Sequence, residues 1–101
     1  MDGNLSLHGS VNRPAVANSY SKLSSENILA FAGAEEGLYV AMHCILKKDD
    51  HAIIITPNYQ SSETIPASIC DVSGIVLEAG NNWNLDVQKI KDAIRPNTRL
   101  I

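Results

Sequence analysis

The stretch Phe31-Ala32-Gly33-Ala34-Glu35-Glu36-Gly37 joins a short apolar run, Asn27 to Phe31, to a segment with helical periodicity. In that segment, Ala34 to Lys48, apolar residues recur every three or four positions, glutamates fall in the first turn and lysines in the last. This charge order favours a helix, because the helix dipole is positive at its start and negative at its end. The junction therefore predicts a buried strand over residues 28–31 and a helix whose first free backbone N–H groups suit an anion.

Strands and helices alternate along the rest of the chain. Residues 51–56 form a compact β-branched run, typical of a strand buried on both faces, and Pro57 ends it. A helix is predicted from Ser61 to Cys70, with Pro66 either in its first turn or disturbing it. The remaining predicted elements are a turn over residues 71–74, a strand over 75–77, a helix from Leu85 to Ile94 capped by Asn84, and a strand beginning at Thr98. This alternation predicts an α/β protein with a mainly parallel sheet.

The 101 residues allow one domain at most. Residues 1–25 are polar and interrupted by glycine and proline, so we expect a weakly structured lead segment with a short helix over Pro14 to Leu23. The domain is expected over residues 26–101. Because its last strand has only begun when the sequence stops, the chain is expected to be a fragment of something longer.

The composition argues against several classes of function. Hydrophobic residues make up 45% and charged residues 19%, an ordinary globular balance. A formal net charge of −3, without a basic stripe, argues against nucleic-acid binding. Short apolar runs and the absence of a signal-peptide pattern argue against a membrane location, so a cytoplasmic protein is expected. Cys44 and Cys70 are interpreted as buried free thiols, with a disulfide as the alternative, and the scattered histidines argue against a zinc site.

Several segments, taken together in their order and spacing, carry a resemblance that no single one of them would support. They are Tyr20-Ser21-Lys22-Leu23-Ser24-Ser25-Glu26-Asn27-Ile28, Gly33-Ala34-Glu35-Glu36, Asp50, Thr56-Pro57-Asn58-Tyr59-Gln60-Ser61 and Ile94-Arg95-Pro96-Asn97-Thr98-Arg99-Leu100-Ile101. From about Tyr20 onward, the chain resembles the class I/II aminotransferases, pyridoxal-phosphate enzymes of the aspartate aminotransferase fold type. The resemblance implies a partial three-layer α/β sandwich, the N-terminal part of the family's large cofactor domain.

The resemblance also implies a cofactor, pyridoxal 5'-phosphate, and roles for two segments. In the family, backbone amides at the glycine-alanine junction bind the cofactor phosphate; by position these are the amides of Gly33, Ala34 and Glu35. The aromatic residue two places after the strand-ending proline stacks on the pyridine ring, and here it is Tyr59. Taken alone, Gly33 is more often a turn former and Tyr59 a core or rim aromatic side chain.

No catalytic residue is assigned. The family's Schiff-base lysine, its aspartate for the pyridine nitrogen and its arginine for the substrate carboxylate all lie beyond the last residue of this sequence. Lys22 has serine-rich neighbours like those of the family's lysine, but it precedes the phosphate junction, so we interpret it as part of the lead into the first strand. In the family's seven-stranded sheet that first strand lies apart from the next three, and here we expect it to lack its neighbours.

The expected function is that of a fragment of an aminotransferase, inactive alone. The intact enzyme would move an amino group between an amino acid and a 2-oxo acid, as a homodimer whose sites are completed across the subunit interface. The alternative is a small α/β phosphate-binding or interaction module without catalysis.

Overall fold

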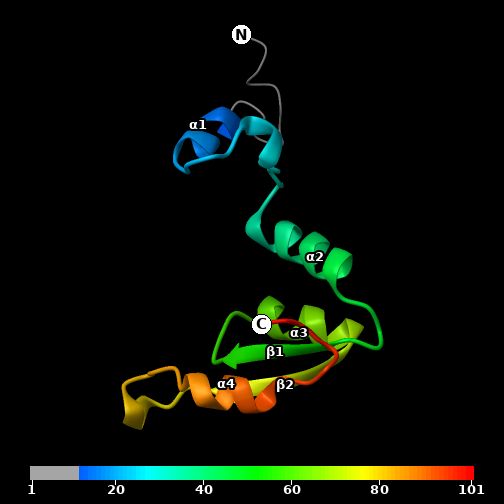
Figure 1. The fold of residues 1–101 in the computed structure, drawn as a ribbon, viewed down its shortest axis with the longest axis vertical. Coiled ribbons are helices and arrows are strands. Elements are labelled where there is room, and N and C mark those ends of the chain that lie inside the picture. Colours follow the sequence, from blue (N-terminus) through cyan, green and yellow to red (C-terminus); the bar gives the residue numbers. More distant parts are fainter. Residues whose placement is uncertain (1–11) are drawn as a thin grey trace. The chain divides into compact units, whose positions relative to one another are not determined.

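The computed structural model describes residues 12–101. The described chain divides into two compact units, one ending at Gly37 and the other spanning Leu38–Ile101. Figure 1 traces both units along the sequence. The second unit holds the sheet and most of the buried residues.

The first unit contains the helix α1 (Arg13–Asn18), the short 3-10 helix η3 (Ser25–Asn27) and the start of the helix α2 (Ala34–Ile45). Arg13 ties α1 to η3, because its Nε and Nη2 atoms donate to the backbone carbonyl of Ser25 at 3.1 and 2.8 Å. Pro14 stands in the first turn of α1, where its missing N–H costs no intrahelical bond. The helix expected from Pro14 to Leu23 is therefore present but ends earlier, at Asn18.

Residues 28–31 do not form a strand, so that prediction is wrong. The backbone of Ile28 is extended, with φ −110° and ψ 128°. A strand, however, needs a neighbouring strand to bond its backbone, and within residues 12–101 the three strands all belong to the second unit. Phe31 instead lies against the first turn of α2: a Cβ added to Gly37 would stand 3.2 Å from Phe31 Cδ2.

The helix α2 confirms the helix predicted from Ala34 to Lys48, although it ends three residues before Lys48. The Asp50 carboxylate accepts a hydrogen bond from the Lys47 backbone N–H at 2.7 Å, which holds the chain in a turn after the helix. Of the apolar positions expected on one face, Met42 is buried in α2 and Leu46 directly after it, whereas Leu38 is partly exposed.

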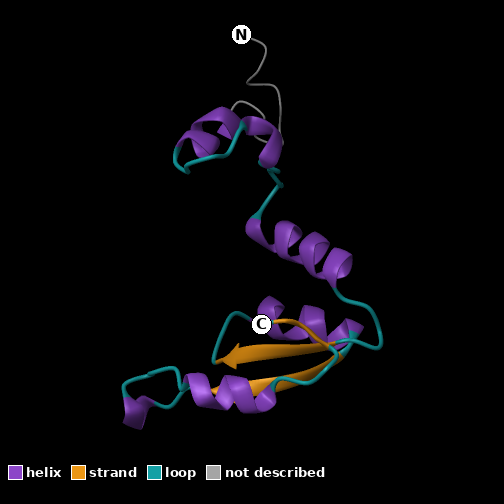
Figure 2. Cartoon of the chain, viewed as in Figure 1, coloured by secondary structure: helices purple, strands orange, loops and turns teal. Residues whose placement is uncertain are grey.

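The sheet has three parallel strands, β1 (His51–Thr56), β2 (Asp71–Val76) and β3 (Thr98–Leu100), in the order β2-β1-β3 (Figure 2). The predicted parallel α/β sheet is thus confirmed. The turn predicted over residues 71–74 is wrong, because β2 begins at Asp71 and pairs with β1 in register from there. Pairing with a buried neighbour overrides the turn preference of the Asp-Val-Ser-Gly sequence.

Two helices cover the sheet, α3 (Gln60–Ile69) and α4 (Val87–Ala93), and a 3-10 helix, η4 (Ala79–Asn81), precedes α4. The crossover from β1 to β2 and the crossover from β2 to β3 run in opposite directions across the sheet. Right-handed crossovers then require the two helices to lie on opposite faces, as Figure 1 shows. This gives the three layers that the family resemblance implied.

Two details of these helices differ from the prediction. Pro66 lies in the interior of α3, not in its first turn, and its ring is fully buried in the unit. The cap of α4 is Asp86 instead of Asn84: its Oδ1 accepts from the backbone N–H of Gln88 at 2.9 Å, and the helix begins at Val87.

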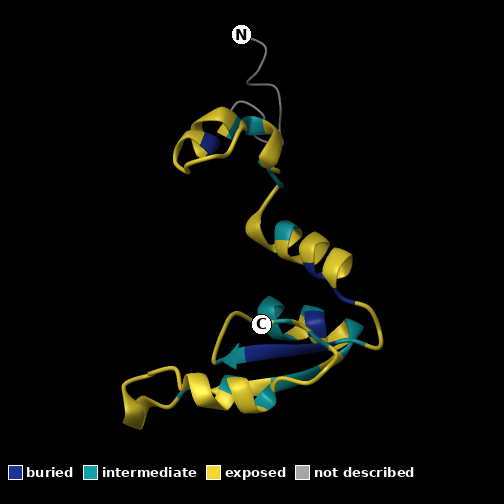
Figure 3. Ribbon diagram, viewed as in Figure 1, coloured by how far each residue is buried: buried dark blue, intermediate teal, exposed yellow. Residues whose placement is uncertain are grey.

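The core of the second unit centres on β1, whose first four residues are buried, as predicted for a strand covered on both faces (Figure 3). The buried cluster and the half-buried residues packed on it are Met42, Leu46, Ala52, Ile54, Ile65, Ile69, Cys70, Val72 and Leu100. Both cysteines are free, as expected. The predicted burial is wrong for Cys44, which is exposed, and Cys70 is half-buried. Within residues 12–101, no helix is long and apolar enough to cross a membrane.

Candidate functional site

The glycine-alanine junction forms the exposed start of α2. Ala34 is the first residue of the 12-residue helix, and the carbonyl of Gly33 accepts the bond from the Gly37 N–H at 3.2 Å. Gly33, Ala34 and Glu35 are all exposed, and a Cβ added to Gly33 would meet nothing within 4 Å. An exposed helix start of this kind offers its first backbone N–H groups, which have no partner within the helix, to an anion.

Tyr59 lies in the loop that follows the carboxyl end of β1. The Thr56–Pro57 peptide bond is cis. Asn58 shapes this loop, because its Oδ1 accepts from the Tyr59 backbone N–H at 2.8 Å and its Nδ2 donates to the Ile55 carbonyl at 3.4 Å. The side chain of Tyr59 is 82% exposed, which excludes a core aromatic and leaves its ring free to stack on a ligand.

Pro57, Asn58 and Tyr59 line a shallow hollow of about 370 Å³. Of the expected site, Gly33, Ala34 and Glu35 belong to the first unit and Tyr59 belongs to the second.

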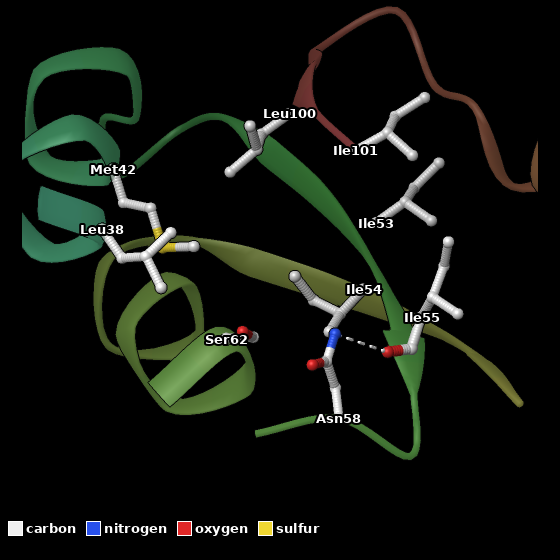
Figure 4. Close-up of a pocket in the computed structure, with 9 residues that line it drawn as sticks. All are labelled: Leu38, Met42, Ile53, Ile54, Ile55, Asn58, Ser62, Leu100 and Ile101. Carbon is white, nitrogen blue, oxygen red and sulfur yellow. Dashed lines mark hydrogen bonds between the residues drawn. The ribbon is translucent and has the colours of Figure 1, made fainter. Parts of the chain in front are cut away.

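A second pocket, of about 350 Å³, is mainly apolar and lies wholly within the second unit (Figure 4). Its lining residues come from α2, β1, the loop after β1, α3 and the end of the chain; they are Leu38, Met42, Ile53, Ile54, Ile55, Asn58, Ser62, Leu100 and Ile101. Sequence reasoning did not find this pocket, because it depends on β3 lying beside β1. Asn58 lines both hollows, so the Tyr59 loop and the apolar pocket share one polar side chain.

A cluster of polar side chains lies at the amino ends of the strands, away from Tyr59. His51, fully buried at the start of β1, has its Nδ1 atom 2.7 Å from Thr98 Oγ1 and its Nε2 atom 2.8 Å from Ser73 Oγ. Arg95 donates to the Asp71 carboxylate and, at 3.3 Å, to Ser73 Oγ. The Arg95 guanidinium hydrogen-bonded to Asp71 holds the pKa of that carboxyl below its ordinary value.

Two other predicted features are located by the structure. Lys22 is exposed in a turn between α1 and η3, with a left-handed φ of 69°, which agrees with a lead-in role. Burial, with Asp50 and Asp71 adding to it, raises the pKa of the Cys70 thiol and so disfavours its nucleophilic thiolate. In the part of the chain that the structure describes, no three metal-ligating side chains gather.

Comparison with known proteins places this arrangement among aminotransferases. The family model for aminotransferase class I and II matches residues 7–101. An aspartate aminotransferase of Pyrococcus horikoshii is 33% identical over 95 residues, covering 88% of this chain and 24% of the relative. A histidinol-phosphate aminotransferase of Methanosarcina mazei is 26% identical, covering 81% of this chain and 22% of the relative.

Solved structures agree at the level of the fold. A PLP-dependent aminotransferase from Streptococcus suis superposes with a TM-score of 0.81 at 29% identity, over 88% of this chain and 24% of that one. An Escherichia coli protein with a methionine aminotransferase function superposes with a TM-score of 0.80 at 23% identity, over 93% of this chain and 27% of that one. The chain thus spans about a quarter of the length of the relatives that it matches.

Proposed function

Because this chain belongs to the class I and II aminotransferase family, we propose that it contributes part of the cofactor site of an enzyme that transfers an amino group between an amino acid and a 2-oxo acid. The observation that carries the proposal is the family match, which extends over both the helix start at Gly33 and the loop at Tyr59. We propose residues 26–101 as the corresponding part of the cofactor domain, with residues 1–25 leading into it. The intact enzyme is proposed to be a cytoplasmic homodimer.

The residues present fit pyridoxal 5'-phosphate at two points. The backbone amides of Gly33, Ala34 and Glu35 lie at an exposed helix start with open space beside the glycine, which suits a phosphate group. Glu35 would contribute its amide and keep its carboxylate in solvent. Tyr59, on a loop held by Asn58, would cover one face of the pyridine ring and exclude water from it. When bound, the cofactor supplies the electron-withdrawing ring that amino-group transfer requires.

Titrating the full chain with pyridoxal phosphate, followed by absorbance, tests the stacking role. Saturable binding is expected, and Tyr59→Ala should weaken it by about 5-fold, since stacking on an aromatic ring contributes on the order of 1 kcal/mol. Tyr20→Ala is the matched control, because Tyr20 is also exposed, at 63%, and lies outside the proposed site. Equal affinities of the two variants would contradict the role of Tyr59.

The phosphate role is tested by Ala34→Pro. Proline is tolerated at the first position of a helix, where it removes one backbone donor and leaves the fold in place. Losing one hydrogen bond to a charged phosphate should weaken pyridoxal phosphate by about 10- to 100-fold and leave pyridoxal, which lacks the phosphate, unchanged.

Three outcomes would overturn parts of the proposal. If Ala34→Pro weakened the affinities for pyridoxal and pyridoxal phosphate equally, the helix start would not hold the phosphate. An imine band that disappears in Lys22→Ala would assign that lysine a covalent role. The absence of any saturable binding would favour a non-catalytic α/β module.

A further inference from the structure

The backbone of Tyr59 is held on both sides by its neighbours. Its N–H donates to Asn58 Oδ1 at 2.8 Å, and its carbonyl accepts from the Ser62 N–H at 3.0 Å. Tyr59 is the N-cap of α3, with an extended backbone of φ −61° and ψ 142°. Both polar groups of its backbone are therefore satisfied, and neither bond involves the ring.

An aromatic residue is an unusual N-cap for a helix. Serine, threonine, aspartate and asparagine are preferred there, because their side-chain oxygen accepts from an otherwise free N–H group of the first turn. The side chain of Tyr59 makes no such bond to α3. Local rules of stability are broken chiefly at functional sites, and the side chain that breaks the rule here is the one proposed to cover the cofactor.

The side-chain amide of Asn58 joins the backbone of Tyr59 to the end of β1. While Oδ1 accepts from Tyr59, Nδ2 donates to the Ile55 carbonyl at 3.4 Å (Figure 4). The strand is a firm base for this link, because its first four residues are buried and the carbonyl of Thr56 at its end accepts from the Leu77 N–H at 2.7 Å. One amide thus connects the tyrosine to the most buried strand of the sheet.

We propose that Asn58 is a positioning residue, which acts on cofactor binding only through Tyr59. Its amide fixes the tyrosine backbone to β1, so the ring is held near its stacking position before the cofactor binds and less conformational entropy is lost on binding. The inference rests on the function proposed above, in which Tyr59 covers the pyridine ring.

A double-mutant cycle in the full chain tests this role, with the affinity for pyridoxal phosphate as the measurement. Asn58→Ala should weaken binding by about 2- to 4-fold, less than the loss of about 5-fold expected for Tyr59→Ala, because a less restrained ring still stacks. Asn58→Ala added to Tyr59→Ala should cause no further loss, since the residue through which Asn58 acts has gone. Asn84→Ala is the matched control, at an exposed asparagine in another loop of the same unit.

Amide hydrogen exchange and a conservative variant separate positioning from general stability. In Asn58→Ala the Tyr59 amide should exchange about 5-fold faster, because it loses its acceptor, while the amides of residues 52–55 change little. Asn58→Asp keeps the oxygen that accepts from Tyr59, so the protection of that amide should be retained. The affinity for pyridoxal should be retained as well, because pyridoxal has no phosphate for the new carboxylate to repel.

Two results would overturn the inference and leave the proposed function in place. If Asn58→Ala caused the same loss of affinity with and without the tyrosine ring, Asn58 would act on binding by another route. If Asn58→Ala caused no loss while Tyr59→Ala did, the ring would need no such support. Unchanged affinity in Tyr59→Ala, in contrast, would contradict the stacking role itself, and the inference would fail with it.

Discussion

At the scale of single residues, the start of β1 combines a predictable burial with hydrogen bonds that could not be predicted. A run of isoleucines indicates a strand covered on both faces, and Ile53 and Ile54 are indeed buried. The hydrogen-bond partners of the His51 ring could not be predicted, because they lie 22 and 47 positions further along the chain. Only the topology of the sheet brings these hydroxyl groups to the ring.

The isoleucine at the centre of β1 should be among the most costly residues to truncate. Ile53 is 1% exposed, so Ile53→Ala removes buried methyl groups and leaves a cavity. We expect the free energy of unfolding to fall by about 2–5 kcal/mol, measured by urea denaturation. Val76→Ala, at a position 58% exposed in β2, should cost under about 1 kcal/mol, and a similar loss for both variants would contradict the assignment of the core.

The ion pair between Asp71 and Arg95 should make the stability of the fold depend on pH in the acid range. Arg95 lowers the pKa of Asp71 in the folded chain, so the pair stabilises the fold above the ordinary aspartate pKa of about 3.9. That contribution is lost as the pH falls through the lowered pKa of the folded state. Asp71→Asn should therefore flatten the fall in melting temperature between about pH 5 and pH 2.

The control for this experiment is Asp49→Asn, which changes an exposed aspartate just before β1. Its melting temperature should keep the acid dependence of the unchanged chain. If Asp71→Asn kept that dependence as well, the ion pair would not be the source of it.

At the scale of elements, long periodic segments were predictable and their boundaries were not. The helix α2 follows from its spacing and its charge order, and β1 follows from its composition. The start of β2 was missed because Asp71-Val72-Ser73-Gly74 has turn composition, and only its neighbour β1 makes it a strand. Residues 28–31 have strand composition but no neighbouring strand among the described residues, so they form no strand despite that composition.

The cap of α4 provides a test of one such boundary. Asp86 accepts from the Gln88 N–H, so Asp86→Ala should destabilise the first turn of α4 by about 1 kcal/mol. Amide exchange of residues 88–90 should be faster by several fold. Lys89→Ala, on the exposed surface of the same helix, is the control, and Asn84→Ala should also have no effect. A larger effect at Asn84 would restore the cap predicted from the sequence.

At the scale of the whole molecule, buried residues are distributed unevenly between the two units. Among the described residues of the first unit, Ala17 is the buried apolar residue, whereas the other buried apolar residues, including Ile53 and Leu46, lie in the second. Few buried contacts mean little resistance to local opening. Of the candidate site, the position of Tyr59 after β1 was predictable from the proline that ends the strand, but its exposure and the neighbouring pocket depend on tertiary structure.

Hydrogen exchange along the whole chain should reproduce this division. Amides of residues 52–55 should exchange slowest and those of residues 12–33 fastest, by at least about 100-fold, because the first group opens only with the core. The exchange rates of both groups of amides are measured in the unaltered chain, with a denatured sample as the fully exchanged reference. Comparable protection in the two units would show that the first unit is supported by contacts stronger than those described.

The two hydroxyl partners of the His51 ring also have a kinetic consequence. Ser73 lies 22 residues from His51 and Thr98 lies 47 residues from it. Loop-closure entropy makes the longer closure costlier by about 0.7 kcal/mol, so pairing of β1 with β2 is favoured before β3 docks. This is also the order in which the strands leave the ribosome, so the serine partner of the imidazole becomes available before its threonine partner.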